Sequence, residues 1–155
     1  MVDPVTRGYM PPSGSVEWLT PPLLYQWLNS RYGPFTFDPS PYPLPPGFNG
    51  LTVPWKDRWF CNPPYGLQIR DWVQKGYEEM THRGKRGVFL LPSRTDVRWF
   101  AEYAPRGEVI FITGRVHYQR PDGSTAPAPF PSLILAFGYN RHGFSIARVP
   151  GTGAP

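Results

Sequence analysis

The sequence offers little material for disulfides or metal sites. Its 155 residues include one cysteine, Cys61, and three histidines. A single cysteine excludes an internal disulfide and a cysteine-rich zinc site. Because His117 and His142 have no carboxylate or cysteine at ligand spacing, we expect both to be structural and expect no metal. Cys61 lies in an apolar run without a nearby histidine, which favours a buried core residue over a nucleophile.

Long apolar runs and glycine-rich phosphate-binding signatures are also missing. No stretch approaches the ~20 consecutive apolar residues that a membrane-spanning helix needs. Residues 1–15 are polar and rich in proline and glycine, unlike a signal peptide. We therefore expect no membrane partner and a cytoplasmic location. Neither a Walker loop nor a Gly-x-Gly-x-x-Gly segment after a strand is present, so a nucleotide cofactor must be held without these signatures.

The composition favours one folded domain with a basic surface. Hydrophobic residues make up 40% of the chain and aromatic residues 16%, which is enough to build a core. We expect a single domain over residues 17–149, a flexible lead over 1–16 and a loose tail over 150–155. The formal charge of +5 favours a polyanionic partner, because phosphates neutralised by lysine or arginine release counterions.

The most informative segment is Asn62-Pro63-Pro64-Tyr65. Two consecutive prolines fix the backbone and remove two donors, so the carbonyl oxygens of Asn62 and Pro63 remain available to a ligand. An exocyclic amino group donates one hydrogen to the Asn62 side chain and one to the Pro63 carbonyl, while Tyr65 stacks on the attached ring. The same residues are also compatible with a stiff turn, since Asn-Pro commonly starts turns.

The surroundings of this segment favour the binding interpretation. The apolar run over residues 58–61 predicts a strand, and the spacing of apolar residues over 67–82 predicts a helix. Ligands of open α/β sheets bind outside the carboxyl ends of the strands, which is where a strand-to-helix junction lies.

Further patterns predict the rest of the fold. Thr20 is a plausible N-cap of a helix that ends at Gly33. The proline-rich residues 40–50 predict an irregular loop. We expect strands over 35–37, 87–92, 108–113 and 142–149, a helix over 95–103, and a hairpin made of 114–118 and 131–137 that closes the sheet.

Several segments beyond the tetrapeptide carry a resemblance to a known family. They are, in chain order, Glu17-Trp18-Leu19-Thr20-Pro21, Phe37-Asp38-Pro39, Phe60-Cys61-Asn62-Pro63-Pro64-Tyr65-Gly66, Leu91-Pro92-Ser93-Arg94-Thr95-Asp96 with Trp99-Phe100, Gly114-Arg115-Val116, and Pro131-Ser132 with Leu133-Ile134-Leu135-Ala136-Phe137. In this order and spacing the chain resembles the phage-type (Dam-like) DNA N6-adenine methyltransferases over roughly residues 17–138.

The resemblance implies the fold class and the activity. We expect an α/β protein with an abbreviated Rossmann-like sheet, as in S-adenosylmethionine-dependent methyltransferases, and a C-terminal antiparallel hairpin. The implied activity is methylation of the N6 amine of adenine in DNA, with Asn62, Pro63, Pro64 and Tyr65 as the catalytic segment. The implied origin is a phage or prophage whose DNA is protected from host restriction.

Cofactor contacts are expected from two further segments. The carboxylate of Asp38 follows a short predicted strand and suits the ribose hydroxyls or the methionine ammonium of S-adenosylmethionine, although Asp-Pro also starts turns. Thr20, at a helix start, suits the methionine carboxylate, although simple capping explains it equally well. The resemblance places the Thr20-Pro21 and Asp38-Pro39 pairs at the cofactor site. Trp18 borders the same pocket or belongs to the core.

Methylation of adenine in DNA requires that the base leave the stack or be presented on a single strand, with Tyr65 as the stacking surface. Arg94 and Arg115, at the ends of predicted strands, are candidate phosphate contacts. Methylation of an RNA adenine or of a protein glutamine amide uses the same amine geometry and stays open. So does a catalytically silent DNA-binding module. The sequence specifies neither the recognition sequence nor the oligomeric state.

Overall fold

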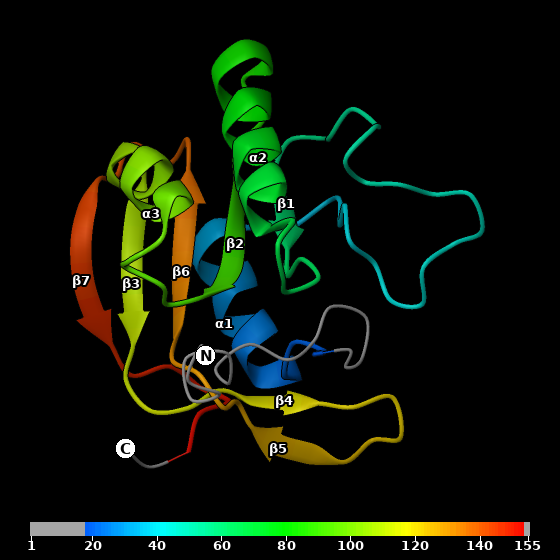
Figure 1. Cartoon of the computed structure of the whole chain (residues 1–155), viewed down its shortest axis with the longest axis vertical. Coiled ribbons are helices and arrows are strands. Elements are labelled where there is room, and N and C mark those ends of the chain that lie inside the picture. The colour runs from blue at the N-terminus through cyan, green and yellow to red at the C-terminus, as the bar shows by residue number, and fades with distance from the viewer. Residues whose placement is uncertain (1–17, 154–155) are drawn as a thin grey trace, which may run out of the picture.

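The computed structural model of the chain describes residues 18–153 (Figure 1). The helices are α1 (Pro22–Tyr32), α2 (Ile69–Arg83), α3 (Arg98–Tyr103) and the 3-10 turn η2 (Ala104–Arg106). The strands are β1 (Trp59–Cys61), β2 (Gly87–Pro92), β3 (Glu108–Ile112), β4 (His117–Gln119), β5 (Thr125–Pro127), β6 (Ser132–Phe137) and β7 (Gly143–Ala147).

Five of these strands form a mixed sheet in the order β1-β2-β6-β3-β7. β1 pairs with β2 and β3 pairs with β7 in parallel, whereas β6 runs antiparallel to both of its neighbours. Figure 1 shows α2 and α3 in front of this sheet and α1 behind it. The α/β class is confirmed. A Rossmann-like arrangement is not, because an antiparallel strand separates the two parallel pairs.

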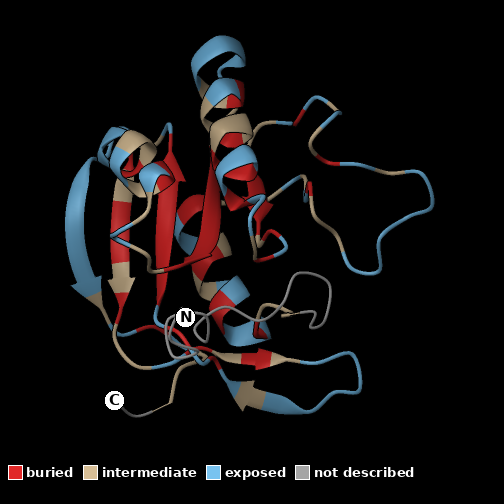
Figure 2. Ribbon diagram, viewed as in Figure 1, coloured by how far each residue is buried: buried red, intermediate tan, exposed pale blue. Residues whose placement is uncertain are grey.

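The core is centred on β2 and β6, in which every residue is buried (Figure 2). Apart from Ser132 at the start of β6, both strands consist of apolar residues and glycine, which suits a sheet covered by helices on its two faces. Gly87 shows how tightly β2 packs against β1. A Cβ atom there would lie 1.9 Å from the Trp59 ring, so no other residue fits without moving the indole.

The predicted hairpin is present with different strands. β4 and β5 pair with each other in a separate two-stranded antiparallel sheet, whereas residues 132–137 form β6 in the middle of the main sheet. The prediction that 114–118 and 131–137 form a closing hairpin is therefore wrong. The physical reason is the sequence of β6, in which every residue after Ser132 is apolar, so that the strand requires burial on both faces and suits a central position in the sheet.

Three smaller predictions also need correction. Pro21, and not Thr20, occupies the N-cap position of α1, and no side chain caps this helix. Residues 35–37 form no strand, since only Phe37 bridges to Trp59. The helix expected over 95–103 begins at Arg98. α1 ends before Gly33, as predicted.

The chain between α1 and β1 contains no helix and no strand. In Figure 1 this connection extends well away from the sheet, and Figure 2 shows that its outermost part is exposed. The predicted irregular loop over residues 40–50 is thus confirmed. Within residues 18–153, no helix combines the length and the apolar character that crossing a membrane requires.

Candidate functional site

A cavity of about 750 Å³ lies at the carboxyl end of β1. Its volume is in the range of cofactor and small-ligand sites. It is lined by Trp18, Leu19, Thr20, Tyr25, Asp38, Pro39, Ser40, Pro41, Tyr42, Leu44, Phe48, Asn49, Gly50, Phe60, Asn62, Pro63, Pro64, Tyr65 and Trp72. The fold therefore joins the tetrapeptide, the Asp38-Pro39 pair, Thr20 and Trp18 in one cavity. Pro21, Arg94 and Arg115 do not line it.

The side chain of Asn62 is held in one orientation by the segment before α1. Its Nδ2 donates to the carbonyl oxygen of Trp18 at 2.6 Å and to the Thr20 hydroxyl at 3.1 Å. Because a carbonyl can only accept, the amide must present its nitrogen to Trp18 and its oxygen elsewhere. That oxygen, Oδ1, is buried and has no hydrogen-bond partner among the described residues. Thr20 thus orients Asn62 instead of capping α1.

The prolines leave a second acceptor at the same place. Pro63 is buried, Pro64 is exposed, and neither has a backbone N–H to donate. No described donor reaches the carbonyl oxygen of Pro63. Asn62 Oδ1 and the Pro63 carbonyl oxygen are therefore two acceptors on adjacent residues without a donor among the described residues.

Tyr65 is more deeply buried than the sequence suggested. Its hydroxyl lies 2.8 Å from that of Tyr118, which is 3.3 Å from the Ser132 hydroxyl. The rings of Tyr118 and Phe130 meet the Tyr65 ring edge-on, at interplanar angles of 83° and 82°. Burial raises the pKa of Tyr65 well above its usual value, so the phenol stays protonated at neutral pH. The ring is fixed in place at the cavity wall.

Tyr118 and Phe130 were not among the predicted site residues because each lies more than 50 residues after the tetrapeptide, and Ser132 was identified only as part of the Pro131-Ser132 segment. Tyr118 belongs to β4 and Ser132 to β6, so the hydroxyl chain links the tetrapeptide to both sheets. The segments around these residues are apolar, which predicts that they lie in the core. This pattern does not indicate that they contact the Tyr65 ring.

Asp38 lies in the cavity wall, and its carboxylate accepts from the backbone N–H of Ser40 at 2.8 Å. The residue as a whole is exposed, because the cavity is open to solvent. Neighbouring protein atoms nonetheless partly desolvate the carboxyl group. This burial raises the pKa of Asp38 to about 6, and the Ser40 N–H opposes the rise. At pH 7 the carboxylate is mostly ionised and well suited to a cationic ligand or to ribose hydroxyls.

Two indole donors add to the polar groups of the cavity. Trp18 and Trp72 both line it, and the Nε1 atom of each is buried with no acceptor among the described residues. Trp72 was predicted only as an apolar residue of the helix over 67–82. Helical spacing identifies a buried indole but not the cavity that it borders.

The loop over residues 40–50 also forms part of the cavity wall, to which it supplies Ser40, Pro41, Tyr42, Leu44, Phe48, Asn49 and Gly50. Its proline content indicated irregular structure and gave no sign of where the loop lies.

The two arginines predicted to contact phosphates differ in their surroundings. Arg94 makes a two-point ion pair with Asp96, with both N–O distances at 3.0 Å. Arg115 is exposed, and no described residue makes a hydrogen bond or ion pair with its side chain. Arg115 is therefore the better candidate for a phosphate contact. Among residues 18–153, no group of three or more histidine, cysteine or carboxylate side chains is arranged to hold a metal.

Comparison with known proteins identifies one family. The chain matches the family described as DNA N-6-adenine-methyltransferase (Dam) over residues 10–130. No curated protein and no solved structure matches the chain. The matched range includes the tetrapeptide, Thr20 and Asp38, and it ends just before β6. Because the match spans most of the sequence and contains the tetrapeptide and the polar residues that share its cavity, the chain belongs to the DNA N-6-adenine-methyltransferase (Dam) family.

Proposed function

We propose that this protein transfers a methyl group from S-adenosylmethionine to the N6 amine of adenine in DNA. The observation that carries the proposal is the state of the Asn62 amide. Its nitrogen is engaged by Trp18 and Thr20, while its buried oxygen has no partner among the described residues. A buried acceptor without a donor costs about 1–3 kcal/mol, and an amino group bound in the cavity removes this cost.

The residues of the cavity fit S-adenosylmethionine. The ionised Asp38 suits its ribose hydroxyls or its ammonium group, and the indole Nε1 atoms of Trp18 and Trp72 suit its carboxylate or ring nitrogens. Apolar walls come from Phe48 and Phe60. When bound, this cofactor supplies an electrophilic methyl group on a sulfonium and leaves as S-adenosylhomocysteine.

The tetrapeptide acts on the acceptor amine. The N6 lone pair of adenine is delocalised into the ring, which makes it a poor nucleophile. Accepting both N6 hydrogens, at Asn62 Oδ1 and the Pro63 carbonyl, favours a pyramidal nitrogen and stabilises the positive charge that develops on it. The nitrogen–carbon bond forms as the carbon–sulfur bond breaks, and the surplus N6 proton then leaves to water.

Tyr65 supplies the surface for the base. Its ring is held edge-on by Tyr118 and Phe130, so one ring position persists for a planar ligand. Stacking on a preorganised aromatic ring costs little conformational entropy. The base reaches this position after extrusion from a duplex or directly from a single strand.

The test is product identification. Purified protein is incubated with methyl-labelled S-adenosylmethionine and DNA, the DNA is digested to nucleosides, and label is expected in N6-methyl-2′-deoxyadenosine. Replacing Asn62 with alanine is expected to lower the rate by about 100-fold or more, the usual loss for a preorganised group that stabilises transition-state charge.

Gln74→Ala is the matched control, because Gln74 is another carboxamide but lies on α2 outside the cavity. It should retain the wild-type rate. Label found in RNA or protein and not in DNA overturns the choice of substrate. Calorimetry that detects DNA binding but no heat with S-adenosylmethionine identifies a silent binding module instead.

A further inference from the structure

The loop over residues 40–50, called the cavity loop below, is closed at its base. A Cβ atom on Gly50 would lie 1.9 Å from the carbonyl oxygen of Pro39, so the two ends of the loop are in direct contact. The buried indole of Trp55 donates from Nε1 to the Gly50 carbonyl at 2.7 Å. A surface loop whose ends meet in this way is frequently functional.

The body of the loop is stiff. Prolines at positions 41, 43, 45 and 46 restrict its backbone. Asn49 forms a turn at its end, since its Oδ1 accepts from the N–H of Leu51 at 3.0 Å and its carbonyl from the N–H of Thr52 at 3.1 Å. The cavity loop is therefore preorganised, and it keeps its shape when it meets a partner.

The outer part of the loop exposes apolar side chains. Leu44 is 61% exposed and Tyr42 is 48% exposed, although both border the cavity. Residues 39–55 include no charged side chain, in a protein with a net charge of +5. An uncharged apolar loop enters an apolar environment without the large cost of desolvating a charge. The interior of a base stack is such an environment, whereas the phosphates outside it favour cations.

We propose that the cavity loop enters duplex DNA beside the target adenine, and that Leu44 fills the space that the adenine leaves in the stack. This inference rests on the proposed function. Extruding a paired base costs a few kcal/mol, and an apolar side chain inserted between base steps restores part of the lost contact. Because Leu44 and Asn62 line the same cavity, the inserted side chain borders the cavity that receives the extruded base.

The experiment compares Leu44→Ala with Leu23→Ala on a duplex and on its single strand. Leu23 lies on α1 outside the cavity and is also 61% exposed, so it controls for removal of an exposed leucine. We expect Leu44→Ala to lower the ratio of duplex to single-strand methylation rates by about tenfold, corresponding to ~1.4 kcal/mol of lost support for extrusion. Leu23→Ala should leave the ratio unchanged.

A rescue substrate sharpens the test. An adenine placed opposite an abasic nucleotide is already unpaired. Leu44→Ala should therefore methylate it at a rate close to that of the wild-type protein. Equal losses on duplex and single strand, together with weaker S-adenosylmethionine binding by calorimetry, would show that Leu44 only forms the cavity wall and would overturn the inference. If the wild-type protein methylates neither form of DNA, the proposed function fails instead.

Discussion

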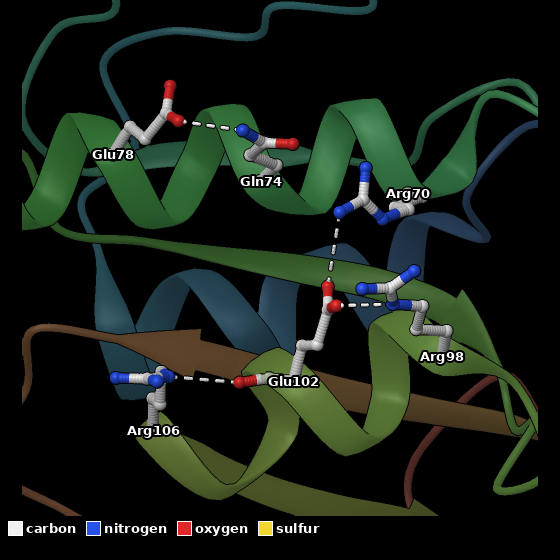
Figure 3. A network of polar contacts seen from close by, with 6 residues as sticks. All are labelled: Arg70, Gln74, Glu78, Arg98, Glu102 and Arg106. Carbon is white, nitrogen blue, oxygen red and sulfur yellow. Dashed lines mark hydrogen bonds and ion pairs between the residues drawn. The ribbon is translucent and has the colours of Figure 1, made fainter.

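The cavity and the surface shared by α2 and α3 differ in how their polar side chains are hydrogen-bonded. On the surface, Glu102 accepts from Arg98 at 2.7 Å and from Arg70 at 3.3 Å, and Arg106 donates to the Glu102 carbonyl (Figure 3). In the cavity, Asn62 Oδ1 and two indole nitrogens are buried with no partner among the described residues. These surface groups are paired although water could serve them, whereas the three cavity atoms are shielded from water and have no described partner.

This contrast separates structural from functional polarity. Exposed ion pairs contribute little to stability, because solvent already stabilises each charge. Buried groups without partners destabilise the free protein, and their persistence is typical of sites that bind a ligand. Substitutions in the cavity are therefore expected to change activity more than they change the free energy of unfolding. Substitutions on the α2–α3 surface should have only small effects on both.

After Asn62→Ala, the largest effect should come from Asp38→Asn. We expect affinity for S-adenosylmethionine to fall by about 10- to 100-fold, since a charge-assisted hydrogen bond contributes ~1.5–3 kcal/mol. Calorimetry measures this. Asp122→Asn is the matched control, because Asp122 and Asp38 each accept from the N–H of a serine two residues later at 2.8 Å.

The pH dependence of Asp38 provides a second measurement. Its pKa is 3.8 in an unfolded chain and about 6 in the folded protein, so the folded state binds the proton more tightly. The free energy of unfolding of the ligand-free protein should therefore decrease as pH rises between these values. Cofactor affinity should increase over the same range. In Asp38→Asn both trends should flatten, and the ligand-free variant should be more stable than the wild type at pH 7.

The next largest effect is expected from the hydrogen bond between the hydroxyls of Tyr65 and Tyr118. Tyr118→Phe leaves the buried Tyr65 hydroxyl without its partner, which should cost about 1–2 kcal/mol in the free energy of unfolding. Urea denaturation measures the loss. In the double variant with Tyr65→Phe, neither hydroxyl remains, so the combined loss should be smaller than the sum of the single losses. Additive losses would contradict a direct interaction between the two.

A smaller effect is expected at the two arginines. Arg115→Ala should weaken DNA binding several-fold and reduce the dependence of log affinity on log salt by about one unit, because one phosphate contact is lost. Arg94→Ala should have less effect, since Asp96 already neutralises Arg94. Fluorescence anisotropy over a salt series checks both, and a larger change for Arg94→Ala would reverse the assignment.

The smallest effect should follow Glu102→Ala. It removes the ion pairs with Arg70 and Arg98 on an exposed surface, so the free energy of unfolding should change only slightly, and less still in high salt. The methylation rate should stay within about twofold of the wild type. A large loss of activity would remove the distinction between the cavity and the surface.

Much of the local structure was predictable. The strand over 87–92, the helix after the tetrapeptide and the end of α1 before Gly33 follow from apolar spacing and helix-terminating residues. Asn62 and Asp38 were identified by their chemistry, and they do line one cavity. The placement of β6 was not predictable in this way, because an apolar run indicates burial without naming its neighbours in the sheet.

The sequence by itself determined the strand-to-helix junction and the stiff Asn-Pro-Pro-Tyr segment within it, because backbone restriction by proline and apolar periodicity act over a few residues. Only the tertiary structure decided which way the Asn62 amide faces, since its partners Trp18 and Thr20 lie 44 and 42 residues away. The tertiary structure also decided the position of the Tyr65 ring, which Tyr118 and Phe130 contact, and the position of the cavity loop. Such contacts depend on how the whole chain packs, which local patterns do not encode.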